Sequence, residues 1–186
     1  MNTANVRNRG YFKIKGAASA FNFDFRGKVV LDIGSSTGGF TEYALERGAE
    51  KVIAVEKGTH QMKAPLKFDQ RVELFEKTDI FEFEAEVDVI MADVSFVSLK
   101  KILAYAKKKL ASPKTEFLVM LKPQFEADDS QLTKGVVKNE RMRREIIRDF
   151  ETWLKKNGFL IVNKRDNELA GRTGNVERFY YLKLAK

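Results

Sequence analysis

The sequence contains no cysteine and only one histidine, His60. Without cysteine the chain cannot form disulfide bonds or zinc–thiolate sites, and it has no thiol nucleophile. A single histidine cannot supply a multi-histidine metal site, so we expect no bound metal. We place His60 at the surface, where polar side chains usually lie.

Long apolar runs are also missing. No stretch approaches the roughly 18 to 20 apolar residues that a membrane-spanning helix needs. The N-terminal segment, MNTANVRNRGYFK, lacks the apolar core of a signal peptide. We therefore expect a cytoplasmic protein with no membrane partner.

Acidic residues are in deficit, with 26 against 34 lysines and arginines, which gives a net charge of +8. A positive excess favours a polyanionic partner such as nucleic acid, because phosphate contacts release counterions. Scattered surface lysines would give the same composition, so charge alone leaves both interpretations open.

The length of 186 residues, with 44% hydrophobic and 32% charged residues, suits one folded domain with a packed core. We expect residues 25–186 to form this domain. Residues 1–24 are expected to form a basic arm with a short helix over Lys15–Phe21.

From Lys28 onward, short β-branched runs alternate with helical patterns, as in parallel βαβ units. The predicted strands are Val29–Ile33, Val52–Val55, Val72–Phe75, Val87–Ala92, Phe117–Leu121, Leu160–Asn163 and Phe179–Leu184. The predicted helices are Thr41–Arg47, Gln61–Lys67, Leu99–Leu110 and Arg141–Lys156. The last two strands have no helix between them, so they should pair antiparallel. The predicted class is α/β, a seven-stranded, mostly parallel sheet with a C-terminal antiparallel hairpin and helices on both faces, as in the Rossmann-like fold of class I methyltransferases.

A glycine-rich loop follows the first predicted strand, where open α/β sheets bind ligands. It reads Gly34-Ser35-Ser36-Thr37-Gly38-Gly39-Phe40. Ser36 stands where the dinucleotide fingerprint has its second glycine, and the lysine of a Walker loop is absent, so a pyrophosphate ligand is disfavoured. The pattern Asp32-x-Gly34-x-x-x-Gly38 resembles the first motif of S-adenosylmethionine methyltransferases.

Two further acids complete the predicted cofactor site. Glu56 ends the second predicted strand, where a carboxylate can accept hydrogen bonds from both ribose hydroxyls. Asp79 follows the third strand and resembles the residue that contacts adenine in these methyltransferases. Asp32 would help hold the amino-acid part of the cofactor.

Five segments together closely resemble the TlyA family, haemolysin-like proteins that are FtsJ-type ribosomal RNA 2′-O-methyltransferases. These segments are Asn8–Lys13, Asp32–Phe40, Ala92–Phe96, Leu121–Glu126 and Gly174–Glu177. The resemblance extends from about Arg7 to Leu184. It implies a catalytic tetrad of Lys13, Asp93, Lys122 and Glu177, with Asp93 also beside the cofactor.

Methyl transfer to a ribose hydroxyl is an in-line displacement that requires alignment and a route for the hydroxyl proton. We expect Lys122 to orient the hydroxyl or take its proton. Asp93 and Glu177 would position the lysines, and Lys13 could bind the reacting ribose or an adjacent phosphate. Unrelated ion pairs at strand ends are the structural alternative.

The expected partner is RNA, and we expect the N-terminal arm to bind part of it. The candidate RNA-binding residues there are Arg7, Arg9, Lys13 and Lys15. Members of the TlyA family commonly carry an N-terminal S4 RNA-binding module, and this sequence starts where that module would end. The expected form of the partner is ribosomal RNA or a ribosomal subunit, and whether another partner supplies the S4 function stays open.

Three other functions stay open at this point. A base or protein N-methyltransferase would share the cofactor half, but Asp93-Val94-Ser95-Phe96 lacks the prolines common after the fourth strand in such enzymes. A catalytically silent RNA-binding or ribosome-assembly factor could keep the same fold. Direct haemolysin activity is disfavoured, because the predicted helix Leu99–Leu110 is better explained as a helix that packs on the sheet and exposes a lysine-rich side.

Overall fold

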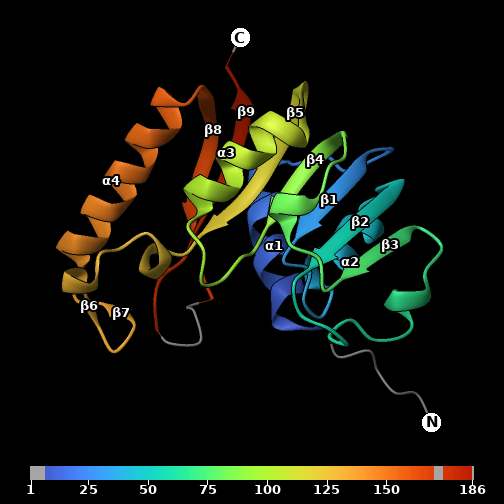
Figure 1. Ribbon diagram of the computed structural model, residues 1–186, viewed down its shortest axis with the longest axis horizontal. Helices are drawn as coiled ribbons and strands as arrows, with labels where there is room; N and C mark the ends of the chain where they lie inside the picture. Colours follow the sequence, from blue (N-terminus) through green and yellow to red (C-terminus); the bar gives the residue numbers. More distant parts are fainter. Residues whose placement is uncertain (1–6, 170–173, 186) are drawn as a thin grey trace.

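A computed structural model of the chain describes residues 7–169 and 174–185. Its centre is a seven-stranded sheet with the strand order β3-β2-β1-β4-β5-β9-β8 (Figure 1). The pairs among β1 to β5 are parallel, and β9 runs antiparallel to both β5 and β8. The predicted α/β class, with a mostly parallel sheet and a C-terminal antiparallel pair, is confirmed.

The strands of this sheet agree with the predicted segments, with changes at their ends. They are β1 (Val29–Ile33), β2 (Lys51–Glu56), β3 (Val72–Glu76), β4 (Val87–Ala92), β5 (Ala111–Leu121), β8 (Phe159–Asp166) and β9 (Arg178–Leu184). The α-helices are α1 (Arg9–Phe21), α2 (Gly39–Glu46), α3 (Leu99–Lys109) and α4 (Glu140–Lys156).

The helices cover both faces of the sheet, as predicted (Figure 1). On one face α3 and α4 bury apolar side chains such as Leu103 and Phe150 against the strands. On the other face α1 and α2 do the same with Ile14 and Ala44. Because both faces are covered, the central strands are apolar along most of their length.

Helix α1 is longer than the predicted Lys15–Phe21, because it begins at Arg9. The Asn8 side chain caps it by accepting a hydrogen bond from the Tyr11 backbone N–H at 3.1 Å. Its inner side chains belong to the core shared with α2. The glycines and basic residues of this segment weaken its apolar periodicity, which is why the pattern missed the first turns. The predicted domain boundary after residue 24 stays a prediction.

Two shorter segments also differ from the sequence analysis. The predicted helix Gln61–Lys67 is wrong, because only the 3-10 turn η1 (Leu66–Phe68) forms there. Pro65 lacks the backbone N–H that a helix interior needs. A small hairpin, β6 (Leu132–Thr133) with β7 (Val136–Val137), lies between β5 and α4 and was not predicted.

Four 3-10 turns occur in the described part of the chain. Besides η1 they are η2 (Ile80–Glu82), η3 (Pro123–Phe125) and η4 (Asp129–Gln131). Within residues 7–169 and 174–185, no helix has both the length and the apolar character to cross a membrane. His60 is exposed, as predicted.

Candidate active site at the carboxyl edge of the sheet

The glycine-rich loop connects β1 to α2 at the carboxyl edge of the parallel strands. Gly34 has a φ of +78°, and a Cβ on it would lie 2.9 Å from the Asp93 carbonyl oxygen. A side chain at this position would therefore separate the ends of β1 and β4. At Gly39 a Cβ would lie 2.1 Å from Asn8 Oδ1, at the start of α1. These glycines let the ends of β1, β4 and α1 meet at one place.

Asp32, on β1, has a fully buried carboxyl group. Its Oδ2 accepts a hydrogen bond from Thr41 Oγ1 at 2.6 Å, whereas its Oδ1 has no hydrogen-bond partner among the described residues. Burial raises the pKa of Asp32 to about 7, although the Thr41 hydrogen bond opposes the shift. Since Asp32 also lines a cavity, the free oxygen is suited to a positively charged ligand group such as an ammonium.

A cavity of about 610 Å³ lies over the ends of β1, β2 and β4. We call it the β2-side cavity, and the acids Glu56 and Asp79 line it. Glu56 accepts hydrogen bonds from the backbone N–H groups of Ser36, at 2.9 Å, and Gly58, at 2.6 Å. Each carboxylate oxygen can accept a second hydrogen bond, so Glu56 can still bind ligand hydroxyls.

Asp79 is held in two ways at the edge of the β2-side cavity. It accepts a hydrogen bond from the backbone of η2 at 3.1 Å, and it pairs with Lys57 at 2.9 Å. The hydrogen bond from Lys57 is the main reason that the pKa of Asp79 lies below its usual value. The side chain is therefore a carboxylate, able to accept hydrogen bonds from a ligand.

A second cavity, of about 560 Å³, adjoins the first and is called here the β5-side cavity. Gly34, Ser36, Asp93, Ser95 and Phe96 line both cavities. A ligand of the β2-side cavity can therefore reach into the β5-side cavity past Asp93. Both volumes lie in the range of pockets that hold small molecules, about 300 to 1,000 Å³.

Two lysine–carboxylate pairs line the β5-side cavity. Lys122, which follows β5, lies 2.6 Å from Asp93 Oδ1 and donates a hydrogen bond to Ser95 Oγ at 2.8 Å. Lys13 of α1 lies 2.6 Å from Glu177 Oε2. Because β9 is antiparallel, Glu177 at its start reaches the edge where the parallel strands end.

The two pairs differ in their exposure to solvent. The side chains of Lys13 and Glu177 are 9% and 4% exposed, whereas those of Lys122 and Asp93 are 12% and 22% exposed. A buried charge is costly to desolvate unless it has a partner, so Lys13 and Glu177 depend on each other more strongly. The Lys122 pair can meet a substrate more readily.

The predicted catalytic residues Lys13, Asp93, Lys122 and Glu177 thus meet in one cavity, and their roles stay predictions. Most of the predicted cofactor residues line the cavities as well. In the β2-side cavity these are Gly34, Ser36, Glu56, Asp79 and Asp93; in the β5-side cavity they are Asp32, Gly34, Ser35, Ser36, Thr37, Gly39, Phe40 and Asp93. Gly38 lines neither cavity and instead forms the N-cap of α2.

The candidate RNA-binding residues are separated by the fold. Arg9 and Lys13 line the β5-side cavity, and Lys15 is exposed on α1. Arg7 pairs with Glu46 at 2.6 Å and lies over the Tyr11 ring. Arg7 therefore helps attach α1 to α2, and it is less available to a ligand than Arg9.

Sequence reasoning missed several side chains of the β5-side cavity. The Phe96 side chain is 93% exposed, with a φ of +63°, and its ring centroid lies 5.2 Å from that of Phe125. Gln124 Oε1 is buried without a hydrogen-bond partner among the described residues. Ser95 contacts Lys122. Phe96 and Phe125 resemble core residues in the sequence, and only their position after strand ends could have drawn attention to them.

Comparison with known protein families identifies the family to which the chain is similar. The model of the family described as FtsJ-like methyltransferase matches residues 6–184. Among curated proteins, the chain is 35% identical to the 23S rRNA (cytidine-2′-O)-methyltransferase TlyA of Campylobacter jejuni, over 93% of this chain and 69% of that protein. It is 36% identical to the 16S/23S rRNA (cytidine-2′-O)-methyltransferase TlyA of Mycobacterium tuberculosis, over 94% of this chain and 67% of that protein.

Solved structures agree with the fold. A Streptococcus thermophilus protein assigned to the haemolysins superposes with a TM-score of 0.92 at 30% identity, covering 100% of this chain and 69% of that chain. The ribosomal protein L11 methylase of Lactobacillus delbrueckii superposes with a TM-score of 0.61 at 18% identity, covering 95% of this chain and 77% of that chain. The second likeness concerns the fold alone.

Proposed function

This chain belongs to the FtsJ-like methyltransferase family, and from that premise we propose that it methylates a ribose 2′-hydroxyl of RNA with S-adenosylmethionine as the cofactor. The observation that supports the proposal is the meeting of Lys13, Asp93, Lys122 and Glu177 in one cavity beside a second, cofactor-sized cavity. These residues come from α1 and from the ends of β4, β5 and β9.

The residues around the glycine-rich loop fit S-adenosylmethionine. The free Oδ1 of Asp32 suits the ammonium of its amino-acid part. Ser35 Oγ, which also has no hydrogen-bond partner within residues 7–169 and 174–185, lies in the same cavity. Glu56 and Asp79 line the β2-side cavity, where they can accept hydrogen bonds from the ribose and the adenine. When bound, the cofactor supplies a methyl group on a positively charged sulfur, which an oxygen nucleophile can displace in line.

Lys122 is the residue best placed to act on the substrate hydroxyl. Asp93 and Ser95 hold its amino group at the boundary of the two cavities, within 2.6 and 2.8 Å. A lysine held in this way can orient a ribose oxygen through its remaining donor and stabilise negative charge that develops there. Proton transfer to Lys122 would require it to be neutral when the substrate binds.

The exposed aromatic rings suit the base of the target nucleotide. RNA-binding proteins stack unpaired bases on aromatic side chains, and each such contact contributes about 1 to 3 kcal/mol. Phe96 presents its ring to solvent at the mouth of both cavities, and Phe125 lies beside it. A left-handed backbone at a phenylalanine is strained, which is consistent with selection for binding rather than folding.

The proposed substrate class is ribosomal RNA. Two supports are the names of the relatives from Campylobacter jejuni and Mycobacterium tuberculosis and the net charge of +8. The whole substrate surface is expected to extend beyond the nucleotide in the cavity, because the basic residues Arg9 and Lys15 lie along α1 next to it. Location in the cytoplasm and a ribosomal subunit as partner stay predictions.

The test is methylation of isolated ribosomal subunits. The purified chain, its Lys122→Ala variant and labelled S-adenosylmethionine are incubated with each subunit, and the modified nucleotide is mapped. We expect label in RNA with wild type only, at a nucleotide whose 3′ phosphodiester resists alkaline hydrolysis, because its 2′-oxygen is blocked. Label on a base or on a protein would favour an N-methyltransferase. Binding of RNA and cofactor without label in either subunit would favour a catalytically silent factor.

A further inference from the structure

Asn167 contacts the buried end of the proposed catalytic tetrad. It directly follows β8, and its Nδ2 donates a hydrogen bond to Glu177 Oε2 at 3.1 Å. The same oxygen lies 2.6 Å from Lys13 Nζ. Glu177 Oε2 is therefore held from two sides, by an ammonium from α1 and by a neutral amide from the end of β8.

The backbone supports the same contact. The Asn167 N–H donates to the Glu177 carbonyl oxygen at 2.8 Å, which extends the pairing of β8 and β9 by one step. The Asn167 amide also donates to the Leu169 carbonyl oxygen at 2.8 Å. The amide is thus fixed in orientation, with one N–H used by the turn and one directed at Glu177.

The end of β8 is tied to the rest of the protein on both faces of the sheet. Asp166 accepts hydrogen bonds from Arg143 and Arg178, each at 2.6 Å. Arg143 is 8% exposed and also donates to the carbonyl oxygen of Val176, the residue before Glu177. The Arg143 guanidinium of α4 therefore contacts both Asp166, which precedes Asn167, and Val176, which precedes Glu177.

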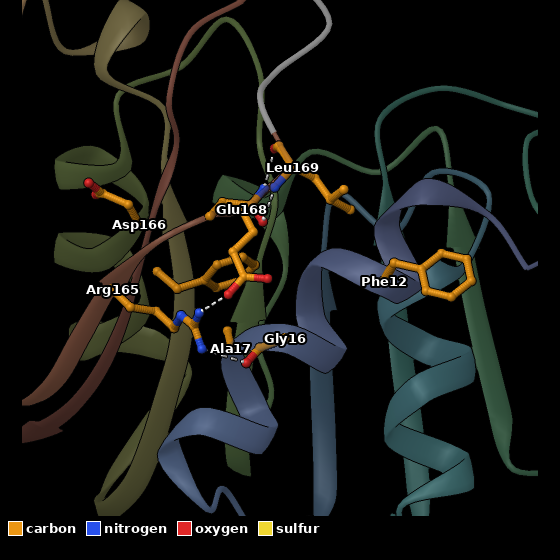
Figure 2. A pocket seen from close by; sticks show the side chains of 9 residues that line it. Phe12, Gly16, Ala17, Arg165, Asp166, Glu168 and Leu169 are labelled. Atoms are coloured by element: carbon orange, nitrogen blue, oxygen red, sulfur yellow. Dashed lines mark hydrogen bonds and ion pairs between the residues drawn. The ribbon is translucent and has the colours of Figure 1, made fainter.

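On the other face, the end of β8 contacts α1. Figure 2 shows Arg165 and Glu168 close to Gly16 and Ala17 of α1. A small hollow of about 40 Å³ lies between the end of β8 and this helix. Arg165 donates to the carbonyl oxygen of Gly16 at 3.3 Å and also pairs with Glu168. Since Lys13 lies on the same helix, this contact sets the position of the lysine relative to Asn167.

We propose that Asn167 is a positioning residue for the methyl-transfer reaction, which holds the Glu177 carboxylate against Lys13 through its amide N–H. The inference rests on the proposed function. A carboxylate free to rotate would leave Lys13 without a fixed partner in a buried site, where an unpaired charge is costly. Because the Asn167 amide is neutral, it can donate to Glu177 while Lys13 remains the charged partner of the carboxylate.

The substitution Asn167→Asp distinguishes a role of Asn167 in positioning Glu177 from a role in forming the turn alone. An aspartate keeps the Oδ1 acceptor for the Leu169 N–H, at 3.4 Å. At every pH it lacks a second donor for the Leu169 carbonyl oxygen, so the loss of that contact does not change with pH. At low pH the introduced carboxyl group is protonated and can donate to Glu177 as the amide does. At high pH it is negatively charged and repels Glu177, and this repulsion raises its pKa above the usual value for aspartate of about 3.9, into the range tested. The ratio of variant to wild-type rate should therefore fall by about 10-fold or more as pH rises from about 5 to about 9.

Two further variants complete the experiment. Asn167→Ala cannot donate at any pH, so its single-turnover rate should be about 10- to 100-fold below wild type throughout, the factor expected for a hydrogen bond to a charged group. Asn163→Asp is the matched control, because it makes the same change at an exposed position of the same strand. Its rate ratio should stay near one at every pH, and S-adenosylhomocysteine affinity should be unchanged in all three variants.

A readout independent of activity is the carboxyl carbon resonance of Glu177 in isotope-labelled protein. In Asn167→Asp it should report the titration of the introduced group, and in Asn163→Asp it should not. A rate ratio near one at all pH values for Asn167→Asp, or a Glu177 resonance that does not respond, would overturn the inference. If wild type methylated no RNA while the resonance did respond, the proposed function would fail and the Asn167–Glu177 contact would stand.

Discussion

On the β2 side of the site Glu56 is held by nearby backbone, whereas on the β5 side Asp93 and Glu177 are held by lysines from other segments. Glu56 accepts hydrogen bonds from the N–H groups of Ser36, in the loop before α2, and Gly58, just after β2. Glu177, near the C-terminus, pairs with Lys13, near the N-terminus. The β2 side can therefore form as soon as its own strands and loops do, whereas the β5 side needs the complete sheet.

This difference has a physical consequence for each side. Backbone N–H groups are neutral and rigid, so Glu56 on the β2 side presents fixed acceptors suited to binding one cofactor. Ion pairs are strong only while both partners are in place, and their energies depend on burial. Single substitutions on the β5 side are therefore expected to lower both the methylation rate and the stability of the protein. Single substitutions on the β2 side should mainly lower ligand affinity.

The largest expected effect comes from Lys122 on the β5 side. Lys122→Ala should lower the single-turnover methylation rate by about 100- to 10,000-fold, the usual contribution of a positioned acid–base group. Lys122→Arg should not restore the rate, because a guanidinium cannot give up its proton. Cofactor affinity should be nearly unchanged in calorimetry.

Lys114→Ala is the control, since Lys114 is an exposed lysine near the start of the same strand. It should leave the rate unchanged. Near-normal turnover by both Lys122 variants would remove Lys122 from the mechanism and reopen the choice between ribose and base as the target.

The second prediction concerns stability on the same side. Glu177→Ala should lower the free energy of unfolding by about 3 kcal/mol, because it leaves the buried Lys13 charge without its main partner. Asp93→Ala should lower the free energy of unfolding by clearly less, since the pair of Asp93 with Lys122 is more exposed. Urea unfolding of both variants measures the difference.

A double variant, Lys13→Met with Glu177→Leu, should recover much of the stability without recovering methylation, because apolar pairs often replace buried ion pairs at little cost. Equal destabilisation by the two single variants would show that burial does not distinguish the two pairs.

The third prediction tests the proposed contact between Asp32 and the cofactor through its dependence on pH. The pKa of Asp32 is raised to about 7, mainly by burial, and its carboxylate form is the one suited to an ammonium. S-adenosylmethionine affinity should therefore rise as pH increases through 7, and it should fall by about 10-fold for each unit below that. Asp32→Asn should bind weakly and lose this pH dependence in calorimetry.

The same group predicts the sign of a stability change. Because the pKa of Asp32 is higher in the folded than in the unfolded chain, the folded state retains the proton between about pH 4 and 7. The contribution of Asp32 to the free energy of unfolding should therefore decrease as pH rises through this window, and Asp32→Asn should remove the decrease. An affinity independent of pH in the wild type would argue against an Asp32–ammonium contact.

The smallest effects are expected along α1, at the edge of the β5-side cavity and beyond it, in the binding of RNA. Arg9 and Lys15 have no ion-pair partner in the described part of the chain, whereas Arg7 is paired with Glu46. Arg9→Ala and Lys15→Ala should each reduce the slope of log affinity against log salt by about one. Arg7→Ala should change this slope less. Equal slopes for all three variants would mean that α1 does not contact phosphates.

The sequence by itself determined the fold class, the order along the chain of the strands of the main sheet, and the place of the acids proposed to bind the cofactor. Strand and helix periodicity is local, and Asp32, Glu56 and Asp79 lie in or shortly after strands that the pattern predicts. For the same reason the carboxyl-edge location of Asp93 and Lys122 could be anticipated. The grouping of Lys13 with Glu177 came only from the resemblance to the TlyA family.

The tertiary structure alone decided features that depend on which segments pack together. The first turns of α1 form because Gly39 admits the Asn8 cap and the core accepts Tyr11, neither of which is visible in a local pattern. Phe96 is exposed, and Asn167 reaches Glu177, because strands distant in sequence end at the same edge. Burial and pairing arise from contacts across the whole chain, so they are established only when the sheet is complete.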